Sequence, residues 1–142
     1  LCLELAASLR VLGRSDETRK ILERAQPLAV ADADKAKLHY HFGNLYFVSG
    51  ASARALESHS EALVSARRAG LAEYECRALS GLADVHYMQG HMVSGHTQSE
   101  ECVGLARQHG LADVVASNLP AMANLRYLSQ GPAAAREIRS AI

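Results

Sequence analysis

The chain repeats itself with a period of about forty residues, and this repetition restricts the folds open to it more than any other feature. The segment 67–73 (RRAGLAE) recurs about forty residues later as 107–113 (RQHGLAD), and Gly90 follows Gly50 by the same distance. Gly13 precedes Gly50 by slightly less, so the first copy has a shorter linker. A period of this size is typical of stacked repeats. We expect about four copies, over approximately 1–33, 34–70, 71–110 and 111–142, with the last one cut short.

Each copy has the composition of two helices. Alanine and leucine dominate, β-branched residues are few and the chain contains 3 prolines, so helix propensity is high throughout. Glycines recur at the predicted helix ends, where glycine adopts a left-handed conformation without a Cβ clash. They are Gly13, Gly50, Gly70, Gly90, Gly110 and Gly131. The sequence therefore predicts an all-α chain with eight helices, over residues 1–12, 15–30, 34–49, 52–69, 71–89, 92–109, 111–130 and 132–142.

Local signals refine these helices. Side chains able to cap a helix N-terminus stand near three predicted starts, as Ser15, Ser52 and either Asp32 or Asp34. Pro132 fits the first turn of the last helix, where its missing N–H costs nothing. Pro120 falls inside the helix 111–130 and should remove the hydrogen bond to the carbonyl of Ala116. We expect a kink there rather than two shorter helices, because both flanks keep helical periodicity.

Small residues recur where paired helices would cross, which lets two backbones approach closely. They are Ala25, Gly43, Ala62, Ala83, Cys102 and Ala123. Hydrophobic residues make up 49% of the chain, which is enough for a core. No single pair of helices can bury its own apolar face, so neighbouring pairs must share one core. We therefore expect one continuous domain over 1–142.

The charge balance argues against a nucleic-acid partner. The chain has 15 Lys and Arg against 15 Asp and Glu, whereas a nucleic-acid-binding surface needs a basic excess. No apolar stretch reaches the ~18 residues that span a membrane, and the first residues lack the basic region of a signal peptide. Because the chain starts at Leu1 rather than at Met, we expect a fragment of a longer protein.

The 3 cysteines predict neither a disulfide framework nor a zinc site. Cys2, Cys76 and Cys102 are odd in number and show no metal-ligand spacing. A reducing, cytoplasmic setting is the simplest one for such a chain. Cys102 falls on a predicted packed helix face, where a free thiol acts as a small hydrophobe.

Residue types that could serve catalysis or bind metal occur at unfavourable spacings. His86, His91 and His96 follow one another at intervals that put them about 140° apart on an ideal helix, and a glycine separates the first from the others. Ser80 and Asp84 share a helix face while His86 points elsewhere, so a nucleophile would lack its base. No phosphate-binding GxxxxGK[ST] loop is present. We expect no catalytic residue, no metal and no cofactor.

These features resemble the tetratricopeptide repeat, which places small residues, an aromatic and a glycine at fixed points of a helical hairpin. The second copy matches most completely, with Gly43, Tyr46, Gly50, Ala55 and Ala62. The other copies match in part, with Ala6, Gly13, Ala25, Ala83, Gly90, Gly95, Cys102 and Ala123. The sequence departs from the family in having no tryptophan, in placing His86 at an aromatic position and in its long period, against the usual ~34 residues. The resemblance implies a right-handed α-α superhelix of about four hairpins, with His59 at a packing position usually held by an aromatic.

A finer resemblance involves the segment 78–92 (ALSGLADVHYMQGHM), followed by Cys102 and Val103. It is similar to the repeat region of large bacterial proteins that join a class III adenylate/guanylate cyclase domain to an AAA-type ATPase domain and a tetratricopeptide tail. It is less specifically similar to the tails of ATPase-type transcriptional regulators. The resemblance implies a regulatory segment of a cytoplasmic signalling protein, itself without cyclase chemistry.

The candidate binding site lies on the predicted concave side, which the first helix of each pair lines in stacked hairpins. Alignment of the copies puts Asn44, Asp84 and Asn124 at one equivalent position. Side-chain amides donate to and accept from a peptide backbone, and tyrosines supply amphipathic contact area. The alternative is that these side chains only pack between helices. The predicted partner-binding residues are Lys37, Tyr40, His41, Asn44, Phe47, Arg77, Ser80, Asp84, Tyr87, Asn124 and Tyr127.

The leading hypothesis for function is a non-catalytic interaction scaffold that binds a peptide, a helix or a neighbouring domain of its own chain. A second hypothesis is a structural spacer that self-associates through uncovered end helices. A third is a sensor that binds a small effector molecule in the groove. Lys37 and Arg77 do not make up the carboxylate clamp of chaperone-binding tetratricopeptide domains, so the acidic tail of a chaperone is not an expected partner.

Overall fold

The computed structural model describes residues 2–130, and this part of the chain is helical with no strand. The elements are α1 (Cys2–Val11), α2 (Ser15–Ala25), the short 3-10 helix η1 (Gln26–Leu28), α3 (Asp32–Val48), α4 (Ser52–Ala69), α5 (Ala72–Met88), α6 (Met92–Gln108) and α7 (Ala112–Gln130). The predicted all-α class is confirmed. The predicted helix 132–142, with Gly131 and Pro132, lies outside the described residues.

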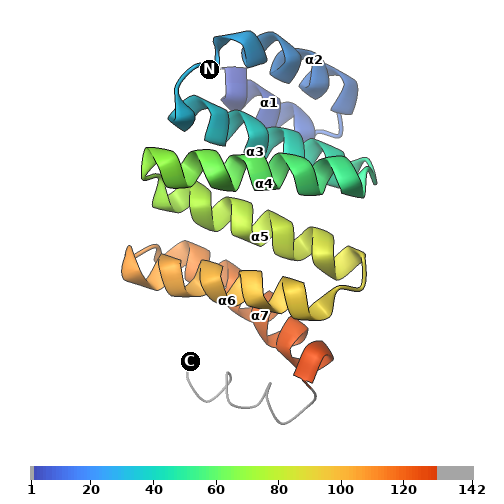
Figure 1. Cartoon of the computed structure of the whole chain (residues 1–142). Coiled ribbons are helices and arrows are strands. Elements are labelled where there is room, and N and C mark those ends of the chain that lie inside the picture. The colour runs from blue at the N-terminus through green and yellow to red at the C-terminus, as the bar shows by residue number, and fades with distance from the viewer. Residues whose placement is uncertain (1, 131–142) are drawn as a thin grey trace.

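The helices stack as consecutive layers along one direction (Figure 1). Helices that follow one another in the chain pack as pairs, most extensively α3 with α4, α5 with α6, and α6 with α7. Contacts also join α1 to α3, α3 to α5, and α5 to α7, so the first helices of successive hairpins form one continuous layer. This stack is compatible with a helical repeat, while the right-handed superhelical twist stays a prediction. None of the helices within residues 2–130 is both long enough and apolar enough to cross a membrane.

The C-terminal ends of the helices agree closely with the predicted ends wherever a glycine follows the helix. Gly13, Gly50, Gly70, Gly90 and Gly110 all have positive φ values, from 65° to 79°. These are left-handed conformations in which a Cβ would be strained. The glycine signal in the sequence is therefore confirmed at all five described positions.

The predicted helix 15–30 is wrong in its last turn. Helix α2 ends at Ala25 and continues only as η1, which contains Pro27. Pro27 has no N–H to donate to the carbonyl of Glu23, so the α-helical hydrogen-bond pattern stops there.

The predicted side-chain caps are also wrong. Ser15 and Ser52 are the first helical residues, and the capping positions belong to Arg14 and Ala51, neither of which caps through its side chain. Helix α3 starts after Ala31 in the same way, so Asp32 and Asp34 lie in its first turn, where their charge favours the helix dipole.

Helix α7 runs without a break through Pro120. The alternative of two shorter helices is therefore excluded, and the expected kink stays a prediction. In the turn before Pro120 the carbonyl of Val114 accepts hydrogen bonds from the side chains of Ser117 (3.1 Å) and Asn118 (2.9 Å).

The core runs through the whole stack rather than within each hairpin. Its largest cluster joins Leu22 of α2, Leu38 and Leu45 of α3, and Val85 of α5. The next cluster joins Cys76 and Leu79 of α5 to Cys102 and Ala106 of α6, and a third joins α6 to α7. Of the small residues predicted at crossings, Gly43, Ala62, Ala83 and Cys102 are buried, while Ala25 and Ala123 are partly exposed.

His59 of α4 is wedged between two glycines of neighbouring helices. Its side chain is only 1% exposed. A Cβ added at Gly43 of α3 would lie 2.5 Å from the imidazole, and one added at Gly81 of α5 would lie closer still. The ring thus fills the space that two missing side chains leave at the junction of three helices, and its predicted packing role is confirmed.

The cysteines differ sharply in accessibility. Cys2 is exposed, whereas Cys76 and Cys102 are fully buried and face each other across α5 and α6, with the Cys102 thiol 3.3 Å from the carbonyl oxygen of Cys76. Burial raises the pKa of both buried thiols, that of Cys102 to about 12. Because the thiolate is the reactive form, burial and protonation together should make these two thiols inert.

We expect a chromogenic aromatic disulfide reagent to modify one thiol per native chain at neutral pH. The other two should react only after denaturant has unfolded the protein, because global opening must expose them. The absorbance of the released thiolate counts the modified groups. Cys2→Ser should abolish the rapid phase, and rapid modification of a second thiol would contradict the described burial.

Candidate functional site

A groove with two hollows runs along the layer formed by α1, α3, α5 and α7. The N-terminal hollow, of about 590 Å³, lies between α1, η1, α3 and α5. The C-terminal hollow, of about 440 Å³, lies between α3, α5 and the first turns of α7. Arg77 lines both hollows, so they lie next to each other, and we refer to the pair as the groove.

The groove-lining side chains come from one face of each helix. Helix α3 contributes Asp34, Lys37, His41 and Asn44. Helix α5 contributes the side chains of Tyr74, Arg77, Ser80 and Asp84. Both sets follow spacings of three and four residues, which place side chains on the same face of a helix. The opposite faces of α3 and α5 enter the core, so this stripe remains available for contacts outside the stack.

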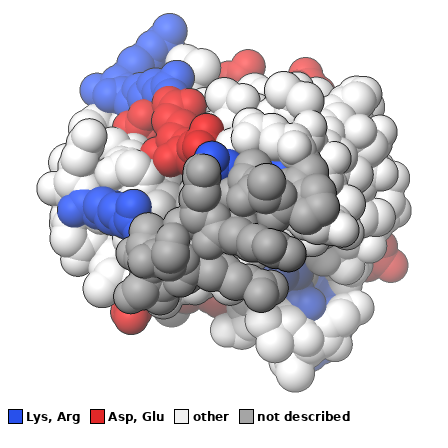
Figure 2. Space-filling view, turned by 90° about the horizontal axis from the view of Figure 1, so that it is seen from below, with Lys and Arg blue, Asp and Glu red and all other residues white. Residues whose placement is uncertain are grey.

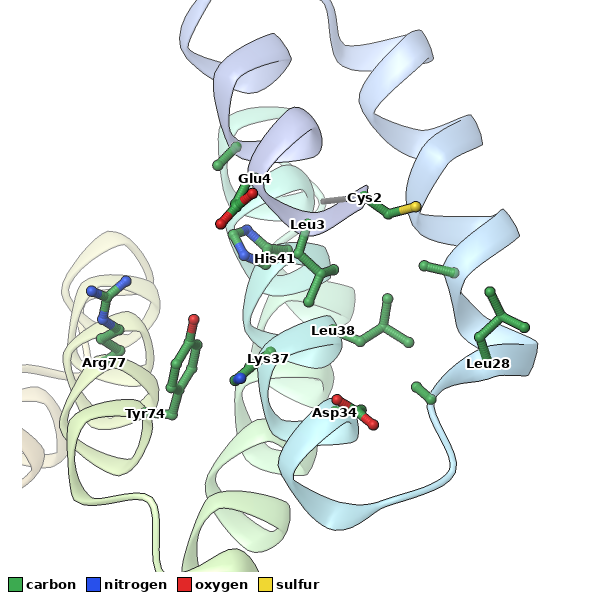
Figure 3. A pocket seen from close by; sticks show the side chains of 13 residues that line it. Cys2, Leu3, Glu4, Leu28, Asp34, Lys37, Leu38, His41, Tyr74 and Arg77 are labelled. Carbon is green, nitrogen blue, oxygen red and sulfur yellow. The ribbon is translucent and has the colours of Figure 1, made fainter.

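The N-terminal hollow combines an apolar wall with a polar one (Figure 3). Leu3, Leu28 and Leu38 form part of the apolar wall. On the polar side, the Tyr74 ring is approached by the Arg77 guanidinium carbon at 5.2 Å and by Lys37 Nζ at 5.9 Å. Both separations are within the range of a cation–π contact.

Arg77 is held in place by several partners at once. It donates a hydrogen bond to a carboxylate oxygen of Glu73 at 2.5 Å, one helical turn earlier. Its guanidinium carbon also lies 5.8 Å from the centre of the Tyr40 ring. The charge of Arg77 is thus already compensated by a carboxylate and two aromatic faces.

His41 is uncharged at neutral pH. Burial, together with the smaller effects of the positive charges of Arg10 and Arg77, lowers its pKa to about 4. A neutral imidazole has one donor and one acceptor nitrogen, so His41 offers the hollow both kinds of hydrogen bond.

The C-terminal hollow is polar and carries two carboxylates. Asp84 of α5 and Asp113 of α7 line it, together with Asn44, Ser80 and Asn118. Burial raises the pKa of Asp84 above its ordinary value. Within residues 2–130, no ion pair or hydrogen bond involves the carboxyl group of either aspartate.

The structure brings seven of the predicted partner-binding residues together in this groove. They are Lys37, Tyr40, His41, Asn44, Arg77, Ser80 and Asp84. The other four line neither hollow. Phe47 packs against the large core cluster, whereas Tyr87, Asn124 and Tyr127 are exposed.

Asn124, the third member of the expected ladder, does not line the hollow that Asn44 and Asp84 share. Asn44 and Asp84 share a hollow, but α7 reaches it with Asp113 and Asn118 of its first two turns. Figure 1 shows α7 inclined to α5. At α7 the residues that line the hollow are therefore not the ones that the alignment of the copies predicts.

Sequence reasoning missed Tyr74, Asp113 and Asn118. Tyr74 could have been found from its position, because it precedes Arg77 by three residues on the same helix face. No sequence signal marks Asp113 and Asn118, since their place in the hollow depends on the angle between α7 and α5.

The residues considered for catalysis and metal binding are separated. Ser80 and Asp84 line the C-terminal hollow, but His86 lies outside it, with its ring 5.7 Å from that of His91. His96 is buried elsewhere, with Nε2 3.7 Å from a carboxylate oxygen of Glu100. In the part of the chain that the structure describes, no group of three His, Cys, Asp or Glu side chains could hold a metal ion.

The C-terminal end of the stack carries no extended charged field on its described surface. Figure 2 shows Lys and Arg beside Asp and Glu in small groups, with neutral residues over most of the visible described area.

No family model and no curated protein sequence matches the chain. The tetratricopeptide resemblance therefore rests on the repeat itself and on the helical stack.

Proposed function

We propose that this chain is a non-catalytic protein-interaction scaffold whose groove binds a peptide, a helix or a neighbouring domain. The observation that carries the proposal is the pair of adjacent hollows, which are lined by polar and aromatic side chains of α3 and α5. Rigid helices position these groups, and a groove of mixed polar and aromatic character is suited to recognition of a protein segment.

We further propose that the scaffold is the tetratricopeptide-like part of a larger cytoplasmic signalling protein, of the bacterial kind that carries cyclase and ATPase domains. The support is the repeat period and the resemblance of the segment 78–92. The groove would then receive either a separate protein or another domain of the same chain.

Filling the C-terminal hollow should block binding. Peptides would first be selected on the wild-type chain from a random display library and their affinities measured by fluorescence anisotropy. In Ser80→Arg a long side chain enters the hollow, and we expect the affinity to fall at least about tenfold, as for the loss of a central contact. The same measurement on the variant decides the outcome.

Ser60→Arg provides the matched control. Ser60 is exposed on α4 and lines neither hollow, so this variant should bind the selected peptides within about twofold of wild type. Equal affinities for Ser80→Arg and Ser60→Arg, or the failure of any peptide to be enriched, would show that the groove is not the binding surface.

Self-association is a second candidate, favoured by exposed apolar side chains at the N-terminal end of the stack. Leu5 of α1 is 50% exposed, and Val11 and Leu12 are 76% and 69% exposed. Uncovered apolar surface at the end of a helical stack favours pairing with a second copy. A mass that rises with concentration in sedimentation equilibrium, and falls to that of a monomer in Leu12→Asp, would support this candidate.

A small-molecule sensor is a third candidate, favoured by the size and lining of the N-terminal hollow. A volume of about 590 Å³ is within the range of ligand pockets, and an apolar wall facing a few polar groups is typical of them. A saturable rise in melting temperature with a metabolite, without any protein partner, would support the sensor.

A further inference from the structure

We propose that the C-terminal hollow receives a basic side chain, an arginine or a lysine, of the bound segment, with Asp84 as its main partner. This inference rests on the proposed function of the groove and specifies what one half of it recognises. It follows from the acceptors that line the hollow, from the ion pair that Arg77 already makes with Glu73, and from the lack of a partner for Asp84 among residues 2–130.

The hollow offers many acceptors. Asp84 and Asp113 contribute carboxylates, and Asn44, Ser80 and Asn118 contribute further oxygen acceptors. Among the described residues, Arg77 is the one cationic side chain that lines this hollow, and it pairs with Glu73 and lies near the rings of Tyr40 and Tyr74. A ligand that brings a positive charge with several N–H donors therefore complements the hollow, while an anionic ligand is opposed by both aspartates.

Asp84 gains most from such a ligand. Its carboxyl group lies at an exposed position on the hollow, and among residues 2–130 it has no hydrogen bond or ion pair. A guanidinium or ammonium group placed beside it would therefore add a charge-assisted hydrogen bond without displacing an existing partner. The proximity of the Tyr40 ring adds an aromatic surface against which a cation can lie.

The N-terminal hollow does not select one sign of charge. Asp34 and Lys37 both line it, one turn apart on α3, beside Arg77. Its apolar wall favours an aliphatic or aromatic side chain instead. The two halves of the groove therefore recognise different chemistry, and the preference for a cation belongs to the C-terminal hollow.

The test uses a pair of blocked peptides that differ in a single charge. Acetyl-Ala-Ala-Arg-Ala-Ala-amide carries one guanidinium, and its citrulline counterpart is a neutral molecule of almost the same shape. Amide chemical shifts of the isotope-labelled full chain report where each peptide binds. We expect the arginine peptide to shift the amides around Asn44, Asp84 and Asp113 saturably and to bind at least about fivefold more tightly than the citrulline peptide.

Asp84→Asn should remove this difference, because the amide keeps the shape of the carboxylate and loses its charge. Asp16→Asn is the matched control, since Asp16 is exposed in the first turn of α2, away from both hollows, and the arginine preference should persist there. Equal binding of the two peptides, shifts confined to other surfaces, or an arginine preference that survives Asp84→Asn would overturn the inference.

The outcome is separable from that of the proposed function. If selected peptides bind the groove but show no preference for arginine over citrulline, the scaffold proposal stands and this inference fails. If the arginine peptide binds through Asp84 while no library peptide is enriched, the cation-binding hollow is supported and the scaffold proposal fails.

Discussion

Replacement of Gly81 by alanine is expected to lower the free energy of unfolding by about 3 kcal/mol, the upper part of the range for overpacking a tight interior. A Cβ at Gly81 would lie within overlap distance of the His59 ring, whose other side meets the backbone at Gly43. The ring cannot move away, because its side chain is 1% exposed and the helices on both sides are fixed by the core. Urea denaturation followed by circular dichroism measures the change.

Gly104→Ala is the matched control for this substitution. Gly104 lies inside α6, and a Cβ added there would meet no atom within 4 Å. Removing a glycine from an exposed helix interior should raise the stability by about 0.5–1 kcal/mol. The pair of variants thus separates the effect of steric overlap from that of helix propensity, and equal effects of the two would contradict the wedged position of His59.

A double-mutant cycle identifies the clashing partner. In a His59→Ala background the ring is absent, so adding a methyl group at position 81 should cost much less than it does in wild type. The coupling between the two substitutions should be about 0.5–3 kcal/mol, the range found for residues in contact. Additive effects would show that the methyl group at position 81 is opposed by something other than His59.

Acidification from neutral pH to pH 4 is expected to destabilise the protein by about 3 kcal/mol through His59 alone. Burial lowers the pKa of His59 from 6.5 to about 4. As the pH falls below 6.5 the unfolded chain takes up a proton on this residue and the folded protein does not, so stability is lost until the pH reaches about 4 and then levels off. Each tenfold difference in proton affinity corresponds to about 1.4 kcal/mol. Denaturant titrations at a series of pH values measure the slope.

His41 adds to the same loss over the same pH range. Its pKa is also lowered to about 4, chiefly by burial and further by Arg10 and Arg77. Its contribution should be smaller than that of His59, because His41 lines the groove and retains some contact with water.

Two measurements check the assignment to His59. His59→Phe keeps a ring at the junction but cannot titrate, so its stability should depend less on pH than that of wild type. A direct titration of the imidazole protons by NMR does not depend on any variant folding. An imidazole of His59 that titrates near pH 6.5 would contradict the prediction.

Much of the fold could be predicted from the sequence because the signals were local. The positive φ of Gly50 or Gly90 follows from the need of a helix end for a left-handed residue, whatever surrounds it. The predicted caps at Ser15 and Ser52 failed for a local reason as well. Each helix begins at the serine itself, so the capping position falls on the preceding residue, whose side chain makes no capping hydrogen bond. Pro27 was the neglected signal, since its missing N–H ends α2.

The candidate site could be predicted only as far as the repeat stays regular. Lys37, Asn44 and Asp84 were identified because α3 and α5 are related by one repeat, so equivalent positions face the same groove. Asn124 does not line the C-terminal hollow and Asp113 was missed, for one common reason. The packing angle of α7 depends on contacts such as that between Gly95 and Leu125, which the spacing of residues within a helix does not reveal.

The packing of His59 between two glycines restricts which hairpins can pack against each other. About forty residues after His59 stands Ser99, also buried, and the same distance after Gly43 stands Ala83. At the second junction, serine therefore replaces histidine on one helix, and alanine replaces glycine on its neighbour. The side-chain volume is thus divided differently between the two helices than it is at the first junction. Exchanging the two junctions would press the imidazole of His59 against the methyl group of Ala83 and leave Ser99 facing an empty space. Hairpins of similar sequence therefore pack well in one order only, which disfavours domain-swapped and out-of-register arrays.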